Sequence, residues 1–225
     1  MIFELGEHIF FPPPEYSEPD GLLAVGGDLN IDRLILAYSQ GIFPWFNPED
    51  PILWWSPDPR PVVVPGKMRV TKNLARLIRR KKFTVTFDRD FETVINRCAD
   101  TFRPGQPGTW LTPQMKEAYI NLHNHGYCHS VEVWLEGKLA GGLYGVALGK
   151  AFFGESMFHA VTDASKVAFY HLSEYLAAKG FHLIDGQVST PHLLSLGAVE
   201  IPRDKFLIML REALKFPTDA RKWGE

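Results

Sequence analysis

The alternation of apolar and polar residues becomes regular only after about residue 62. The preceding stretch holds most of the chain's 17 prolines. Because proline fixes φ and lacks an amide hydrogen, loops around short elements are expected there. One helix fits within this stretch, capped by Asp28 or Asn30 and ended by Gly41. The residues that give it an apolar face are Leu29, Leu34, Ile35, Ala37 and Tyr38.

Beyond residue 62, the spacing of apolar residues predicts a series of helices and strands. The predicted helices are 71–80, 90–99, 112–125, 163–179, 191–196 and 202–215, and the predicted strands are 83–87, 130–135, 139–148, 151–158 and 182–187. Turns at 136–138 and 149–150 join three of these strands, which should form an antiparallel meander. Antiparallel strands followed by a helix and a further strand favour an α+β fold with a mixed sheet.

Composition places the chain among globular proteins. Its 225 residues are 45% apolar and carry a net charge of −2. This length is enough for one main domain with a small partner domain. Cys98 and Cys128 are too few for a disulfide framework and are expected to be reduced. The N-terminus lacks the basic start of a signal peptide, and no apolar run reaches about 18 residues. We therefore expect a soluble, cytoplasmic protein.

Positive charge is concentrated between Lys67 and Lys82, a segment with eight basic residues and no acid. The rest of the chain holds 16 basic and 26 acidic residues. On a helix, four of the cations share one face and repel one another. The segment is either a solvated helix face or a surface that binds a nucleic-acid backbone. The residues proposed to bind are Lys72, Arg76, Arg79, Arg80, Lys81 and Lys82.

Two short polar motifs are candidates for chemistry. Glu155 interrupts an apolar strand, as either a paired structural charge or a ligand for a basic group. Asp185 and Gln187 are two residues apart on a predicted strand, so their side chains should share one face. This pair is either a polar site or an ordinary turn. The sequence has neither the glycine pattern of a nucleotide site nor a convincing nucleophile or metal-ligand set, so no cofactor and no metal are expected.

Longer motifs resemble those of leucyl/phenylalanyl-tRNA–protein transferases. They are DGLLAVGGDL, GIFPWFNPEDPILWWSPDPRPVV, GTWLT, HSVEVWLEGKLAGGLYGVALG, FFGESMF, ASK, LIDGQ and SLGAVEIPR, and they cover nearly the whole chain in order. The resemblance implies a small N-terminal α/β domain, residues 1–61, and a catalytic domain of the N-acetyltransferase (GNAT) fold, residues 62–225. That second domain should have a mixed, mainly antiparallel sheet.

The resemblance also implies an activity and its residues. Leu or Phe, less often Met, would pass from leucyl- or phenylalanyl-tRNA to the α-amine of proteins that begin with Arg or Lys, marking them for proteolysis. Asp185 and Gln187 would be catalytic, Glu155 would pair with the acceptor's basic side chain, and the protein is expected to act as a monomer. Aromatic positions near the terminal adenosine and an apolar slot for the amino acid would be Trp45, Trp110, Leu143, Phe152, Met157 and Ile184.

Two other functions remain open from the sequence. The chain could be a tRNA-binding module without catalysis, on the strength of the basic segment alone. It could also be a CoA-dependent N-acetyltransferase, although the segment at 159–170 contains no glycine where such enzymes bind the CoA pyrophosphate.

Overall fold

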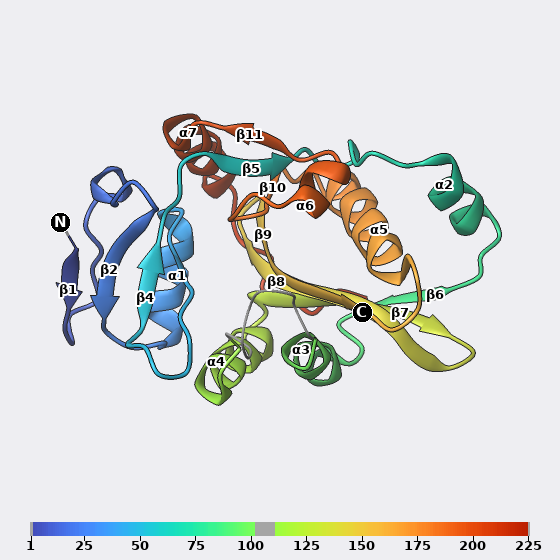
Figure 1. Ribbon diagram of the computed structural model, residues 1–225, viewed down its shortest axis with the longest axis horizontal. Helices are drawn as coiled ribbons and strands as arrows, with labels where there is room; N and C mark the ends of the chain where they lie inside the picture. Colours follow the sequence, from blue (N-terminus) through green and yellow to red (C-terminus); the bar gives the residue numbers. More distant parts are fainter. Residues whose placement is uncertain (1, 102–110, 225) are drawn as a thin grey trace.

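A computed structural model of the chain describes residues 2–101 and 111–224. Two sheets lie side by side, with helices packed around them (Figure 1). The first sheet has the strand order β1-β2-β4-β3, and only β1 and β2 run parallel. Its elements are β1 (Phe3–Leu5), the 3₁₀ turn η1 (Pro14–Tyr16), β2 (Leu22–Gly26), α1 (Ile31–Ser39), β3 (Phe43–Pro44) and β4 (Leu53–Trp55).

The second sheet has seven strands in the order β11-β5-β10-β9-β8-β7-β6. Every neighbouring pair is antiparallel except β9 and β10. Its strands are β5 (Arg60–Val63), β6 (Thr84–Phe87), β7 (Cys128–Leu135), β8 (Lys138–Leu148), β9 (Ala151–His159), β10 (Leu183–Asp185) and β11 (Val199–Ile201). The predicted meander is confirmed as β7, β8 and β9, and so is the mixed, mainly antiparallel sheet.

Helices cover both faces of the larger sheet. Figure 1 shows α3 and α4 on one face and α5 and α6 on the other. The remaining helices are α2 (Lys72–Arg79), α3 (Phe91–Ala99), α4 (Pro113–Asn124), α5 (Ala164–Ala178), α6 (Pro191–Ser195) and α7 (Arg203–Leu214). Helix α5 connects the parallel strands β9 and β10, because parallel neighbours need a long crossover connection.

Short-range chemistry explains where the helices begin. Thr71, Asp90 and Thr112 each accept a hydrogen bond from the backbone three residues on, so they cap α2, α3 and α4. The predicted cap of α1 is only partly right. Asn30 occupies the N-cap position, but its side chain makes no capping hydrogen bond. Asp28 Oδ1 instead accepts the main-chain N–H of Asn30 at 2.9 Å.

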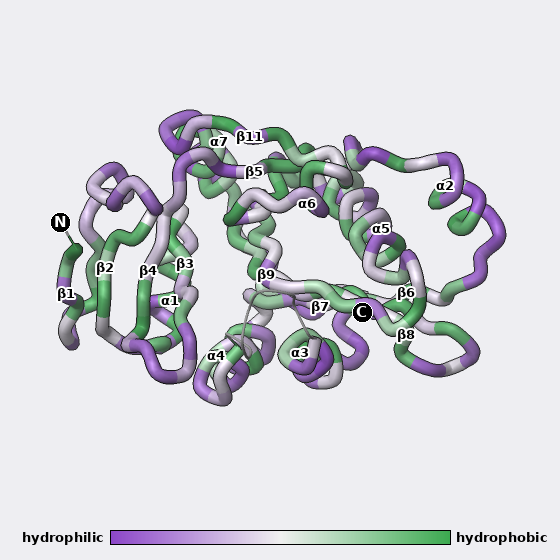
Figure 2. The backbone as a smooth tube through the Cα atoms, viewed as in Figure 1, coloured by the Kyte–Doolittle hydropathy of each residue, from purple (hydrophilic) through white to green (hydrophobic). Residues whose placement is uncertain are grey.

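The apolar residues form two buried clusters. One joins the N-terminal sheet to the α3/α4 face of the larger sheet, and the other fills the α5 face. Figure 2 shows hydrophobic residues along β2 and β4 and hydrophilic segments beside α2. Because the first cluster includes both Trp54 and Val94, the two sheets share one interior. The domain boundary at 61/62 stays a prediction; it falls within β5, a strand of the larger sheet.

Within residues 2–101 and 111–224, every helix is too short or too polar to span a bilayer.

Candidate active site

A cavity of about 490 Å³ opens where β9 and β10 separate. These strands pair only from Leu183/Ala151 to Asp185/Phe153, although β9 continues to His159. The end of β10 and the rest of β9 therefore diverge, and the gap becomes one wall of the cavity. Phe43 of β3 and Trp45, which directly follows that strand, line the same cavity.

A bulge in β9 shapes this wall. Tyr144 of β8 is opposite Ser156, but the next residue, Gly145, is opposite Gly154. Glu155 is therefore the extra residue, and a bulge re-aims the side chains around it. Phe152 and Met157 are five residues apart and would face opposite sides of a regular strand. The bulge places both on the α5 face, where Phe152 is buried and Met157 packs against the same cluster.

Apolar side chains line one part of the cavity. The four side chains predicted to form an apolar slot line it together with two side chains from α5 that the sequence did not indicate. The six are Leu143, Phe152, Met157, Ile184, Phe169 and Leu172. All of them except Met157 are buried, so the slot is part of the rigid core.

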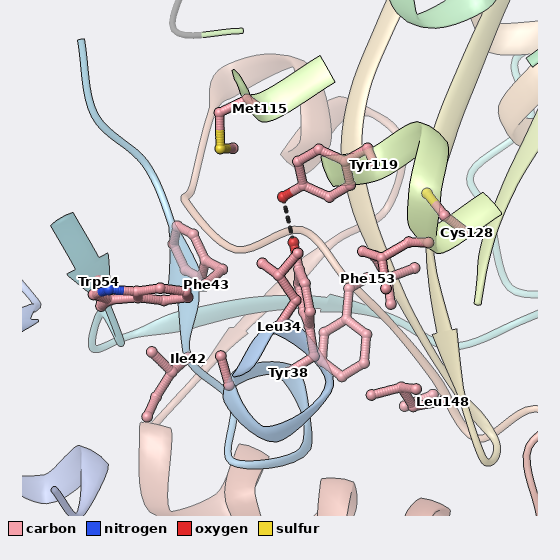
Figure 3. Close-up of a cluster of buried hydrophobic side chains, with 14 of the residues drawn as sticks. Leu34, Tyr38, Ile42, Phe43, Trp54, Met115, Tyr119, Cys128, Leu148 and Phe153 are labelled. Carbon is pink, nitrogen blue, oxygen red and sulfur yellow. Dashed lines mark hydrogen bonds between the residues drawn. The ribbon is translucent and has the colours of Figure 1, made fainter. Parts of the chain in front are cut away.

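A hydrogen-bond network surrounds Glu155 at the polar end of the cavity. Its Oε1 accepts from the Tyr38 hydroxyl at 2.6 Å and from Gln187 Nε2 at 2.6 Å. Its Oε2 accepts from the Tyr119 hydroxyl at 2.9 Å. Figure 3 shows the Tyr38 and Tyr119 hydroxyls meeting each other, at an oxygen–oxygen distance of 2.5 Å.

The number of protons in this network depends on the protonation state of Glu155. Tyr38, Tyr119 and Glu155 form three mutual oxygen–oxygen contacts, but the two phenols carry only two protons. When Glu155 is protonated, its own proton supplies the third, and the carboxyl group then donates in one of its two contacts with the tyrosines. Burial raises the pKa of Glu155 to about 7, against the lowering effect of the hydrogen bonds from Tyr38, Tyr119 and Gln187. The nearby negative charge of Asp185 raises this pKa further.

Asp185 is paired with Arg60 and with the Gln187 backbone. Its two carboxylate oxygens accept from Arg60 Nε at 2.8 Å and Arg60 Nη2 at 2.7 Å, and both residues are buried. Asp185 Oδ1 also accepts the main-chain N–H of Gln187 at 2.8 Å. The side-chain amide of Gln187 is instead held by Glu155. Asp185 therefore fixes the Gln187 backbone, and Glu155 holds the Gln187 side chain.

Gln187 has an unusual backbone. Strand β10 ends at Asp185, two residues earlier than predicted, and Gln187 adopts the left-handed region with φ of 62°. Such a conformation is costly for a residue other than glycine and persists where its surroundings impose it. With Nε2 bound to Glu155, Gln187 Oε1 accepts no hydrogen bond from the described part of the chain. Gln187 lines the cavity, so its amide provides an acceptor there.

The two tryptophans predicted to contact the terminal adenosine are Trp45 and Trp110. Trp45 lines the cavity, is 40% exposed and lies against Trp55 with ring centroids 5.7 Å apart. Trp110 lies outside the described residues.

The six predicted tRNA-binding cations are all exposed on and after α2, and none forms an ion pair with another described residue. Helix α2 packs on α5, at the end of the molecule away from the N-terminal sheet (Figure 1).

Sequence reasoning missed three residues that organise the site. Tyr38 was interpreted only as part of an apolar helix face, and Tyr119 and Arg60 gave no separate signal. Each comes from a different element, namely α1, α4 and β5, and meets its partner only in three dimensions. Spacing along one element cannot reveal such a contact.

Comparison with known sequences assigns the chain to a family. The model of the leucyl/phenylalanyl-tRNA protein transferase family matches residues 62–211, and the model of its N-terminal domain matches residues 27–58. The chain belongs to the leucyl/phenylalanyl-tRNA–protein transferase family. It is therefore an aminoacyltransferase, whose substrates are aminoacyl-tRNA and protein.

Curated relatives of this transferase match over almost their full lengths. The leucyl/phenylalanyl-tRNA–protein transferase of Maridesulfovibrio salexigens is 54% identical over 224 residues, 99% of this chain and 93% of the relative. That of Syntrophotalea carbinolica is 56% identical over 217 residues, 96% of this chain and 94% of the relative.

Solved structures give a weaker likeness. The structure of L-PGS from Bacillus licheniformis has a TM-score of 0.45 at 10% identity and covers 86% of this chain and 71% of its own. A GCN5-related N-acetyltransferase from Kribbella flavida has a TM-score of 0.40 at 11% identity, covering 74% and 59%. Scores this low carry no argument about the transferase.

Proposed function

We propose that this transferase moves Leu or Phe, less often Met, from aminoacyl-tRNA to the α-amine of proteins that begin with Arg or Lys. The observation that carries the proposal is the cavity, which combines an apolar slot with Gln187 and Glu155 on its wall. An apolar slot suits an uncharged aliphatic or aromatic side chain. The thioether of Met157 can adapt to either shape.

The chemistry needs positioning more than a strong base. The acceptor nitrogen forms a bond to the ester carbonyl carbon, the carbon–oxygen bond to the terminal ribose breaks, and the nitrogen's proton ends on the released hydroxyl. A free α-amine has a pKa of about 7.7–8.0, so a useful fraction is neutral near pH 7. Holding that amine against the carbonyl supplies most of the acceleration.

Gln187 is proposed to orient the amine. An amide cannot titrate near neutral pH, but its Oε1 can accept an N–H from the incoming nitrogen. Glu155 holds the other end of the same amide, and Asp185 holds the backbone beneath it. Tyr38 and Tyr119 fix Glu155 in turn. Asp185 is then a positioning residue and Gln187 the group that touches the substrate.

Glu155 is proposed to select basic acceptors. Its carboxyl lines the cavity, and a cationic side chain there would favour its ionised form. Loss of the proton removes the third proton of the Tyr38–Tyr119–Glu155 contacts, so an entering Arg or Lys would take over part of this network. An acceptor that begins with a neutral or acidic residue gains no binding energy from the ionised carboxylate of Glu155.

The tRNA is proposed to bind through charge and stacking. Lys72, Arg76, Arg79, Arg80, Lys81 and Lys82 would hold the acceptor stem. Trp45, with Trp110, would stack on the terminal adenosine, a contact worth about 1–3 kcal/mol per base. We further propose that the transferase acts as a cytoplasmic monomer and that its products are N-terminal signals for proteolysis.

A transfer assay tests the proposal. Leucyl-tRNA is incubated with peptides identical except for a first residue of Arg, Lys or Asp, and leucyl-peptide is measured by mass. Transfer to the Arg and Lys peptides alone is expected, and the Glu155→Gln variant should lose this discrimination while its affinity for tRNA is retained. Absence of leucyl-peptide with every acceptor would refute the proposed reaction.

A further inference from the structure

The C-terminal segment places Trp223 directly behind the apolar slot. After α7 the chain turns back, and Thr218 Oγ1 accepts the Gly149 N–H at 2.9 Å. Asp88 Oδ2 accepts the main-chain N–H of Trp223 at 2.6 Å. These contacts attach the segment to the turn between β8 and β9 and to the loop that follows β6. The tryptophan is consequently held in place although it is the third residue from the end of the chain.

The Trp223 ring lies in an aromatic cage. It stacks on His129 with centroids 3.9 Å apart and an interplanar angle of 2°, and Tyr175 is 4.9 Å away. His129 is itself fixed, because its Nδ1 bonds to Asp88 Oδ2 at 2.7 Å. Trp223 is only 7% exposed. The ring therefore cannot move without breaking a buried cluster.

Phe152 stands between this cage and the slot. Its ring lies 5.8 Å from that of Trp223, measured between centroids, and it also lines the cavity. On another side Phe152 is confined by Gly145, since a Cβ at Gly145 would come within 2.5 Å of its Cζ. The space open to the phenyl ring is thus bounded by β8, by Trp223 and by whatever occupies the slot.

We propose that Trp223 sets the depth of the aminoacyl slot through Phe152 and so acts as a specificity-determining residue. This rests on the proposed function, because it assumes that the slot holds the esterified amino acid. A smaller side chain at 223 leaves room into which Phe152 can withdraw. The slot then becomes deeper, which favours Phe over the shorter Leu.

The test compares one tRNA charged chemically with either Leu or Phe, so that only the amino acid differs. The ratio of kcat/KM for Phe to that for Leu is measured for wild type, Trp223→Phe and Trp223→Ala. We expect the ratio to rise about 3- to 10-fold in Trp223→Ala, at or below the lower end of the effect of one methylene in an apolar pocket because Trp223 acts only through Phe152, and less in Trp223→Phe. If Trp223→Ala does not fold, Trp223→Phe carries the comparison.

Leu23→Ala is the matched control, because Leu23 is fully buried in β2 and does not line the cavity. It should lower the melting temperature and leave the ratio unchanged. A ratio that stays at the wild-type value in both Trp223 variants overturns the inference. Wild-type protein that transfers neither amino acid would instead overturn the proposed function, so the two failures are distinguishable.

Discussion

Individual side chains in this site act through one another. Gln187 lines the cavity while Glu155 holds its side-chain amide and Asp185 holds its backbone. The sequence indicated these three, because polar residues are unusual within apolar strands, whereas the apolar slot residues were implied by the family resemblance. It could not indicate Tyr38 and Tyr119, whose hydroxyls meet although the residues are 81 apart in the chain.

Replacing Gln187 tests its proposed contact with the amine. Gln187→Met keeps the size of the side chain and removes both polar groups. We expect kcat to fall about 10²-fold, the lower range for assisted proton transfer, with little change in the KM for aminoacyl-tRNA. Steady-state transfer kinetics measure both. A larger effect on the tRNA KM than on kcat would contradict the assigned role.

The raised pKa of Glu155 predicts how stability depends on pH. The folded protein binds this proton more tightly than the unfolded chain, so Glu155 makes folding less favourable as pH rises from about 4.5 to about 7. The loss is about 3 kcal/mol, fully expressed above pH 7. Glu155→Gln should lack this contribution, so its stability relative to wild type should be greater at pH 8 than at pH 5.

Urea unfolding of both proteins at the two pH values measures the difference in their unfolding free energies. The contributions of other titrating groups cancel in this difference, because both proteins contain them. A stability difference that is equal at pH 5 and pH 8 would mean that Glu155 titrates near its ordinary pKa in the folded protein.

Among the described secondary-structure elements, the α-helices, the meander and the short strands β6 and β10 were predicted, whereas β1 to β5 and β11 were not. The helices 163–179 and 202–215 were predicted within two residues of α5 and α7. Strands β1 to β5 and β11 have two to five residues each, too few to show a period. They exist because neighbouring strands pair with them. The bulge at Glu155 is likewise a property of β8 and β9 together.

Arg60 links the short elements around the site. It joins β5 to Asp185 of β10 and donates from Nη1 to the Gly41 carbonyl at 2.9 Å. Arg60→Met leaves a buried carboxylate without its cation, and we expect a loss of about 3–5 kcal/mol in unfolding free energy. The double variant Arg60→Met/Asp185→Asn should recover part of this stability, because no buried charge remains.

Denaturant unfolding of the single and double variants measures this coupling. Asp185→Asn keeps an oxygen that can accept the Gln187 N–H, so the double variant should also retain measurable transfer. An Arg60→Met protein as stable as wild type would show that the pair is not a structural link.

Charge is unevenly distributed over the molecule as a whole. The basic residues of α2 face solvent at one end, and the N-terminal sheet lies at the other (Figure 1). A tRNA bound along α5 could reach both the basic helix and the cavity, since α5 packs on α2 and lines the slot. The net charge of −2 conceals this arrangement.

Neutralising part of the patch should change the salt dependence of tRNA binding. For Arg79→Ala/Arg80→Ala we expect a higher KM for aminoacyl-tRNA, and a log–log salt slope that is smaller by about 0.9 for each phosphate that the variant no longer neutralises. The control is Lys205→Ala/Arg211→Ala, which removes two exposed cations from α7. Equal slopes for the two double variants would place the tRNA elsewhere.

The sequence by itself determined the α+β organisation, the meander, the long helices, the family and the residue types of the cavity. These depend on local periodicity or on motifs that remain recognisable in one dimension. Only the tertiary structure decided that Arg60 forms an ion pair with Asp185, that Tyr38 and Tyr119 hydrogen-bond to Glu155, and that the Trp223 ring packs beside Phe152. Such contacts join residues from separate elements, and their geometry depends on how the strands diverge and how the helices pack.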